Sequence, residues 1–455
     1  MLNKHRLMAV AVALAFSAGS ALAAVSPQEA AKLGDTLTPF GAEKAGNAAG
    51  TIPAWTGGIT QAPAGYTRSG QHHVNPFPED KPLFTITAAN LSQYEANLTP
   101  GQIAMFKAYP ETYQMPVYQT RRSGSAPQWV YDNTVKNATS AKLVDGGNGF
   151  SDAYGGIPFP IPQNGVEALW NHIARYRGTY IVRRASEVAV QRNGAYSLVT
   201  SQQEALFKYY LQNGSFADLN NIMFYYLSFT TSPARLAGGA VLVHETLDQV
   251  KEPRQAWGYN AGQRRVRRAP QVSYDGPGTA ADGLRTSDNF DMYNGAPDRY
   301  DWQLVGKKEI YIPYNAYKLD SPSLKYADII KAGHINQDLT RYELHRVWHV
   351  TATLKSGERH IYAKRDFYID EDTWQAALID HYDGRGTLWR VAEAHAQYYY
   401  DKQVPWYTVE TLYDLLSGRY LALGMKNEEK QAYDFNYKAS GSDYTPAALR
   451  QAGVR

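Results

Sequence analysis

An alternation of apolar and polar side chains over residues 343–354 constrains the fold most. One face carries Leu344, Arg346, Trp348, Val350, Ala352 and Leu354, and it is apolar except for Arg346. The intervening face is more polar and carries Glu343, His345, Val347, His349, Thr351 and Thr353. Successive side chains of a strand point to opposite faces of the sheet. The pattern therefore predicts a long, half-buried β-strand.

Further strands are predicted on both sides of this segment. Ser356-Gly357 and Gly384-Arg385-Gly386 read as turns, and Asn193-Gly194 is a favoured two-residue hairpin turn. The expected strands cover a hairpin over 179–200 and the runs 223–230, 240–244, 360–369, 373–382 and 387–400. Together they predict an antiparallel meander.

Four helical segments are expected between the strands. Asn164 caps an apolar face over 165–176, which predicts a helix there. Ser201 and Glu204 have the spacing of a capping box. The other expected helices are 91–109 in two pieces, 205–211 after that capping box, and 408–416.

These elements predict an α+β, β-rich fold. We expect one large curved antiparallel sheet, helices that cover one face, and a long N-terminal wrap. Residues 24–455 are expected to form one domain, with wrap and irregular loops over 24–164 and the main sheet over 165–455. Whether residues 110–165 form a lid is left open, and the tail from residue 439 is expected to be irregular. Partial cover of a curved sheet would leave a concave apolar site.

The first 23 residues resemble a secretory signal. Lys4 and Arg6 precede an apolar stretch, and Ala21-Leu22-Ala23 is a small-residue cleavage site. Removal of this segment would leave 44 basic and 43 acidic residues, a balance that does not favour a nucleic-acid partner. The sequence contains no cysteine, and no later apolar run is long enough for a transmembrane helix. We therefore expect a periplasmic protein, with peripheral attachment at the outer membrane as an alternative.

Sequence motifs give little support for catalysis. The nucleophile elbow, the phosphate loop, the zinc-protease motif and the dinucleotide fingerprint are absent. His345 and His349 would lie roughly 13 Å apart on a strand, which does not suit one metal ion. We expect a non-enzymatic protein with no cofactor and no metal site, although a dispersed hydrolase site is an alternative.

An acidic cluster and a basic run remain as candidate sites. Asp288, Asp291 and Asp298 offer oxygen ligands for calcium, but their spacing does not match an EF-hand loop. Turn capping and salt bridges to Arg285 and Arg299 are the favoured interpretation. The basic run is either an exposed or ion-paired strand or a contact for an anionic headgroup, and it comprises Arg264, Arg265, Arg267 and Arg268.

Four longer motifs run through the chain. They are Leu33–Gly58, Gly155–His172, Asn294–Trp302 with Tyr311–Asn315, and Tyr444–Arg450. These motifs resemble the pattern of a large proteobacterial family, domain of unknown function 1329 (DUF1329). The resemblance covers essentially the whole chain after the signal.

The resemblance implies a fold and a type of function. The family is similar to the superfamily of the lipoprotein carriers LolA and LolB, in which a curved antiparallel sheet forms an open half-barrel around an apolar cavity for acyl chains. Its members tend to be encoded near an outer-membrane protein family and RND-type exporters, which are candidate partners. No catalytic residue can be carried over, and the chain lacks the cysteine of a lipid-anchored member.

Residues and resemblance together predict a carrier for a lipid or another hydrophobic molecule. Burial of each methylene contributes about 0.8 kcal/mol, so an acyl chain can be held without any reaction. The expected wall comprises Trp348, Val350, Leu354, Phe367 and Trp389, with Arg346 as either a headgroup contact or a buried ion-pair member. A structural adaptor for an outer-membrane or export partner is a further alternative.

Overall fold

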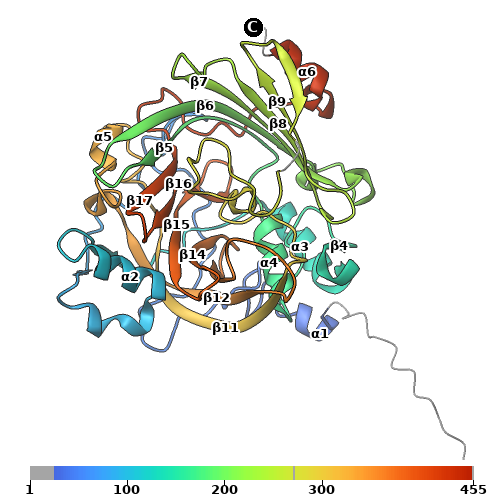
Figure 1. Cartoon of the computed structure of the whole chain (residues 1–455). Coiled ribbons are helices and arrows are strands. Elements are labelled where there is room, and N and C mark those ends of the chain that lie inside the picture. The colour runs from blue at the N-terminus through green and yellow to red at the C-terminus, as the bar shows by residue number, and fades with distance from the viewer. Residues whose placement is uncertain (1–24, 270–271, 453–455) are drawn as a thin grey trace, which may run out of the picture.

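One large sheet runs through the computed structural model, which describes residues 25–269 and 272–452 (Figure 1). The order of strands across it is β1 (Phe84–Ile86), β2 (Met115–Tyr118), β12 (Tyr342–Leu354), β13 (Lys364–Asp370), β14 (Ala376–Tyr382), β15 (Leu388–Tyr399), β16 (Val404–Asp414), β17 (Arg419–Met425), β5 (Tyr180–Val190), β6 (Tyr196–Phe207), β7 (Ile222–Ser232), β8 (Ala240–Thr246), β9 (Gln255–Asn260) and β10 (Arg265–Arg268). β11 (Tyr300–Pro313) pairs with β12. All pairs are antiparallel except the short β2–β12 contact.

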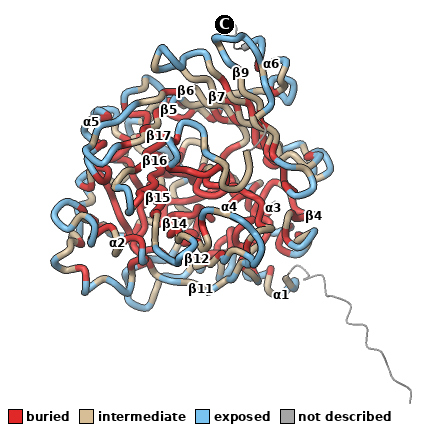
Figure 2. The backbone as a smooth tube through the Cα atoms, in the orientation of Figure 1, coloured by how far each residue is buried: buried red, intermediate tan, exposed pale blue. Residues whose placement is uncertain are grey.

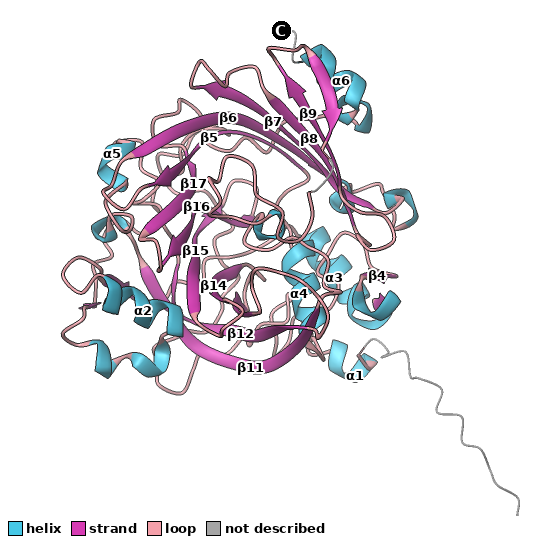
Figure 3. Cartoon of the chain, viewed as in Figure 1, coloured by secondary structure: helices cyan, strands magenta, loops and turns pink. Residues whose placement is uncertain are grey.

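The sheet curves strongly, so it has an inner and an outer face (Figure 3). The predicted β-rich fold with a large curved sheet is confirmed. The alternating segment forms β12, and the hairpin predicted around Asn193-Gly194 joins β5 to β6. A separate small sheet pairs β3 (Lys142–Val144) with β4 (Gly149–Ser151).

Helices lie on both faces of the sheet rather than on one. α4 (Gly165–Ala174) begins at the Asn164 cap and contacts β11 and β12 from the inner side, next to α3 (Gln128–Ser140). α2 (Pro100–Ala108) contacts β14 and β15 on the outer side. The remaining helices are short: α1 (Pro27–Ala30), α5 (Tyr326–Ile329) and α6 (Pro446–Ala452).

Two predicted helices differ in the structure. The helix predicted over 408–416 lies largely in β16, and the helix predicted over 205–211 is replaced by the end of β6 and a single 3-10 turn, Lys208–Tyr210. Every residue of β16 is buried, so its sequence lacks the alternation that marks a half-buried strand. Four helices were missed: α3 within the expected loop region 110–165, α6 in the tail expected to be irregular, and the one-turn helices α1 and α5. α6 starts at Pro446 after Thr445, whose hydroxyl accepts from the Ala448 amide, a favourable start signal.

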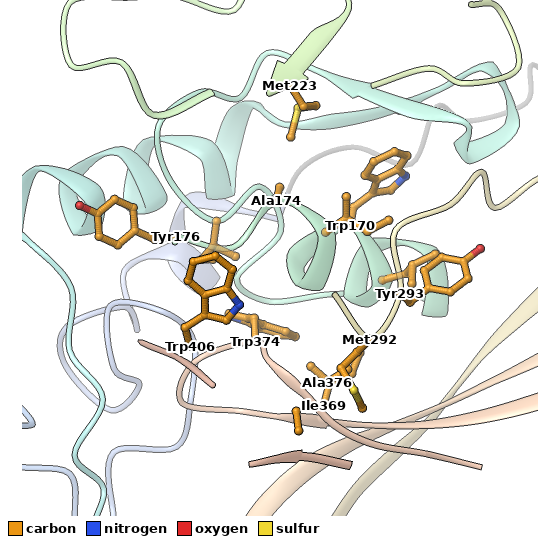
Figure 4. Packing of buried hydrophobic residues seen from close by; sticks show 14 of the residues in the cluster. Trp170, Ala174, Tyr176, Met223, Met292, Tyr293, Ile369, Trp374, Ala376 and Trp406 are labelled. Atoms are coloured by element: carbon orange, nitrogen blue, oxygen red, sulfur yellow. The ribbon is translucent and has the colours of Figure 1, made fainter. Parts of the chain in front are cut away.

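The main core lies between α4 and the inner face of the sheet. Figure 4 shows Trp170 and Ala174 of this helix on one side of the core and Trp374, Ile369 and Ala376 on the other. Buried backbone fills the interior, and exposed backbone follows the outer turns (Figure 2). Burial of such aromatic and branched side chains is the dominant favourable term in folding.

The predicted N-terminal wrap is held to this core by polar contacts. The Trp374 indole donates to the Phe40 carbonyl at 2.8 Å. Arg122 forms a bidentate pair with Asp372 at 2.9 and 2.7 Å and donates to the Glu43 carbonyl at 2.7 Å. The boundary of a single domain over 24–455 stays a prediction.

Substitution of Gly41 tests how tightly the wrap packs. Gly41 has φ +92°, and an added Cβ would lie 1.8 Å from the Pro160 carbonyl oxygen. Gly57 has φ +108° with no atom within 4 Å of its Cβ position. In both alanine variants the free energy of unfolding should fall by about 1 kcal/mol, because alanine disfavours a left-handed backbone conformation. A urea unfolding titration should show a clearly larger loss of free energy of unfolding for Gly41→Ala than for Gly57→Ala. Equal losses in the two variants would contradict the close approach of Gly41 to the Pro160 carbonyl.

The signal predicted over residues 1–23, with cleavage near Ala23, lies outside the described residues. Within residues 25–269 and 272–452, none of the helices combines the length and the apolar composition that a bilayer crossing requires.

Candidate functional site

A cavity of about 170 Å³ lies on the inner face of β5–β9. Alternate residues of these strands form its wall, because every second side chain points inward. The apolar part of the wall includes Val199, Phe224, Tyr226, Val241, Val243 and Ala256. Strand pairing places these residues in register, with Tyr226 opposite Val243 and Ser228 opposite Val241.

The segment 272–290 covers the cavity. It folds back on itself through hydrogen bonds from the Gly278 amide to Arg285 and from the Ser287 amide to Gly276, at 2.9 and 2.7 Å. Arg254 donates to the carbonyls of Val272 and Ser287 at 2.9 and 3.0 Å. One guanidinium therefore holds both ends of the cover. The lining residues of this cavity include none from 110–165.

A narrow aromatic extension adjoins the cavity. It has a volume of about 30 Å³ and shares Arg183, Gln203, Phe224 and Tyr226 with the larger space. Phe207 and Trp406 line it further inside, where Trp406 is 8% exposed. The combined site is amphipathic: valine, alanine and aromatic side chains alternate with charged, amide and hydroxyl side chains, so it offers contacts for both an apolar and a polar part of a ligand.

Most charged groups around the cavity are paired. Arg254 lies 2.7 Å from Glu245, and Arg285 lies 4.0 Å from Glu187. Burial raises the pKa of Glu187, and Arg285 opposes this shift.

Asp291, beneath the cover, binds two further arginines. Its carboxylate accepts from Arg175 at 2.7 Å and from Arg177, and the Trp406 indole donates to it at 3.0 Å. Burial would raise the pKa of Asp291, but Arg175 and Arg177 hold this pKa well below its usual range.

The six residues predicted to hold a ligand lie elsewhere. Val350 and Phe367 are fully buried in the main core, with Leu354 and Trp348 packed at its edge. Trp389 donates to Asp414 at 3.0 Å. None of these residues lines the cavity under the cover. Their role in ligand binding stays a prediction.

Arg346 is a buried ion-pair member, one of the two alternatives for this residue. Its guanidinium lies 3.3 Å from Glu371 and 3.5 Å from Glu43, and it donates to the Ala45 carbonyl at 3.1 Å.

The basic run lies at the edge of the sheet. Arg265, Arg267 and Arg268 are exposed on β10, and Arg264 precedes this strand with φ +51°. In the described part of the chain, no carboxylate lies within 4.0 Å of their guanidinium groups. Charged side chains on an edge strand oppose pairing with other chains. Contact with an anionic headgroup stays a prediction for this run.

The acidic cluster forms ion pairs, but with different partners from those predicted. Asp288 pairs with Arg365 at 2.6 Å and His360 at 3.0 Å, whereas Asp298 accepts from the Tyr274 hydroxyl. Arg299 instead pairs with Glu358. Arg285 pairs with Glu187, so both predicted salt bridges were wrong. The pairing of Asp288 could not be read from sequence because Arg365 and His360 lie more than 70 positions away.

One group of potential metal ligands occurs among the described residues: His345, Asp370 and Asp372, whose ligand atoms lie within 4.8 Å of one another. Arg122 already pairs with Asp372, and Thr373 and Tyr314 donate to Asp370 at 2.6 and 3.1 Å. Hydrogen bonds within the protein thus occupy these carboxylates.

The cavity could not be recognised from the sequence because charged residues lie on the inner face of β5. Arg183 and Glu187 share the inner face of β5 with Ile181, Ala185 and Ala189, so this face reads as the more polar one.

Comparisons with known proteins agree with the motifs. The family model described as "Protein of unknown function (DUF1329)" matches residues 85–450. An uncharacterised protein of Pseudomonas aeruginosa is 69% identical over 444 residues, which cover 98% of this chain and 97% of that protein.

Solved structures with similarity to this chain include three from other bacteria. A putative outer membrane lipoprotein-sorting protein domain from Vibrio parahaemolyticus has a TM-score of 0.44 at 14% identity, covering 63% of this chain and 98% of that one. A DUF1329 family protein from Desulfovibrio piger has a TM-score of 0.41 at 13% identity, and the match covers 60% of this chain and 92% of that one. A LolA superfamily protein from Nitrosomonas europaea has a TM-score of 0.36 at 13% identity, and the match covers 62% of this chain and 98% of that one. By the family match and the close relative, the chain belongs to the DUF1329 family.

Proposed function

We propose that this protein binds a hydrophobic molecule between the inner face of β5–β9 and the covering segment 272–290. The observation that carries the proposal is the cavity itself, a space with an apolar wall of Val199, Val241 and Val243 under a single segment that Arg254 holds in place. Ligand sites are concave spaces that combine apolar side chains with placed polar groups, and this cavity has both, which supports an occupant.

The size of the cavity limits what the closed form can hold. An engineered cavity of about 150 Å³ accepts a benzene molecule, and pockets for larger ligands span roughly 300–1,000 Å³. The observed 170 Å³ therefore suits a short apolar chain. A longer acyl chain requires the covering segment to move outward, and the carbonyl contacts of Arg254 are the bonds that such movement would break.

We further propose that binding occurs in the periplasm, without catalysis, and that the ligand is carried between membranes. The signal-like sequence over residues 1–23 supports export, and the similarity to a lipoprotein-sorting protein domain supports a carrier. Burial of the apolar chain would provide the binding free energy, so no reaction is required.

A series of n-alkanols from hexanol to dodecanol tests the proposed cavity. Affinity measured by calorimetry should rise about fourfold for each added methylene until the cavity is full. Val243→Phe, which fills part of the inner wall, should end this rise at a shorter chain. Leu236→Phe is the control because Leu236 is 40% exposed and does not line the cavity. Absence of binding for every alkanol would contradict the proposal, as would an unchanged series in Val243→Phe.

A further inference from the structure

Arg183 differs from the other arginines of the cavity because it has no carboxylate partner. Arg254 pairs with Glu245, and Arg285 pairs with Glu187. No carboxylate in the described parts of the chain lies within 4.0 Å of the Arg183 guanidinium, although this residue lines both the cavity and its aromatic extension. A guanidinium stays protonated in proteins, so Arg183 contributes an uncompensated positive charge to the site.

The surroundings of Arg183 hold the guanidinium in place and leave part of it free. Its Nε donates to the Gln203 side-chain oxygen at 2.7 Å, and Nη1 donates to the Tyr433 hydroxyl. The rings of Trp406 and Tyr433 lie 5.6 and 4.9 Å from the guanidinium carbon. Within the described residues, Nη2 donates no hydrogen bond. Nη2 of Arg183 is therefore a fixed donor at the cavity that can still donate hydrogen bonds to a ligand.

The other charges nearby do not neutralise Arg183. Asp291 is already bound by Arg175 and Arg177. Glu187 lies four residues further along on the same face of β5, but its ion-pair partner is Arg285, and Arg183 acts on it only at a longer distance. The cavity thus favours a ligand with a negative charge.

We propose that Arg183 binds the anionic headgroup of an amphiphile, a carboxylate or a phosphate monoester, whose apolar chain lies against Val199, Val241 and Val243. This inference rests on the proposed function and adds the class of ligand. A guanidinium presents donors in a planar fork that matches both anions, and such charge-assisted hydrogen bonds are stronger than neutral ones.

Three ligands with the same ten-carbon chain test the inference: decanol, decanoate and decyl phosphate. The wild-type protein should bind at least one of the anions at least tenfold more tightly than decanol. Arg183→Met should abolish this preference and keep the affinity for decanol, whereas Arg183→Lys should keep part of it. The anion with the higher affinity identifies the headgroup. Arg184→Met is the control, because Arg184 is the adjacent, exposed residue of β5.

The outcomes separate this inference from the proposed function. If wild-type protein binds decanol but prefers neither anion, the headgroup role of Arg183 is overturned and the cavity proposal stands. If Arg183→Met weakens decanol and both anions equally, Arg183 only supports the wall, which also overturns the inference. Failure of the wild-type protein to bind decanol, decanoate and decyl phosphate would overturn both proposals.

Discussion

Asp291→Asn is expected to lower the free energy of unfolding by about 3–5 kcal/mol. Asp291 is buried and compensates two buried arginines, Arg175 and Arg177, whose side chains are 0% and 4% exposed. Loss of the negative charge leaves two like charges next to each other in the core, and a buried charge without a partner is strongly unfavourable. Urea unfolding of the variant at neutral pH measures the loss.

A second carboxylate provides the control for Asp291. Asp282 pairs with Arg419 on the surface, where the Asp282 side chain is 61% exposed. Asp282→Asn should change the free energy of unfolding by less than about 0.5 kcal/mol, because exposed ion pairs contribute little. A loss below about 1 kcal/mol for Asp291→Asn would show that the two core arginines do not depend on this carboxylate.

Asp380→Asn should stabilise the protein at alkaline pH and not at acidic pH. Asp380 is fully buried on the outer face of β14, where burial raises its pKa to about 7 despite a 2.9 Å hydrogen bond from the Gly101 amide. A nearby carboxylate, Asp366, raises this pKa further. The folded state therefore retains a proton on Asp380 that the unfolded state has released above pH 4.

The direction of the pH dependence follows from the raised pKa. The contribution of Asp380 to stability is complete below its unfolded pKa and is lost as the pH rises through about 7. Each pKa unit corresponds to about 1.4 kcal/mol, so the full loss from the unfolded pKa to about 7 amounts to roughly 4 kcal/mol. Asparagine keeps an acceptor for the Gly101 amide and carries no charge.

Urea titrations of wild-type protein and Asp380→Asn at pH 4.5 and pH 8.5 measure this difference. The free energy of unfolding of the variant, relative to that of wild type, should be roughly 3 kcal/mol higher at pH 8.5 than at pH 4.5. Burial also raises the pKa of Glu393 to about 7, and the charge of Asp380 adds to this rise, so part of the gain of the variant at pH 8.5 comes from removal of the repulsion between the two carboxylates. An identical stability difference at both pH values would show that Asp380 does not titrate as described.

The sheet could be predicted largely from the sequence because apolar and polar side chains alternate along β12 and turn residues separate the strands, although both faces of β12 are buried over its first six residues. The alternation in β12 and the Asn-Gly turn between β5 and β6 are local signals that tertiary contacts did not override. β16 lacks such a signal because every one of its residues is buried. α3 was missed because its polar composition and the surrounding glycines and prolines predicted a loop.

The candidate site could not be predicted because it depends on contacts between distant segments. Arg183 and Arg346 are both arginines on strand faces that turn inward, and sequence offers no way to distinguish their roles. The structure distinguishes them: Glu371 and Glu43 lie beside Arg346, whereas Arg183 has only neutral partners. The covering segment 272–290 also lacks any periodic pattern, so its place over the cavity appears only in three dimensions.

Photo-crosslinking tests most directly whether an apolar chain lies between β5–β9 and segment 272–290. The probe is decanoate that carries a diazirine at the end of its chain. Peptide mass spectrometry after irradiation should place the crosslinks within residues 199–203, 224–230, 241–245 and 272–290. An excess of unlabelled decanoate should remove them. Specific crosslinks confined to the wall of Val350, Phe367 and Trp389, or absent altogether, would contradict the claim.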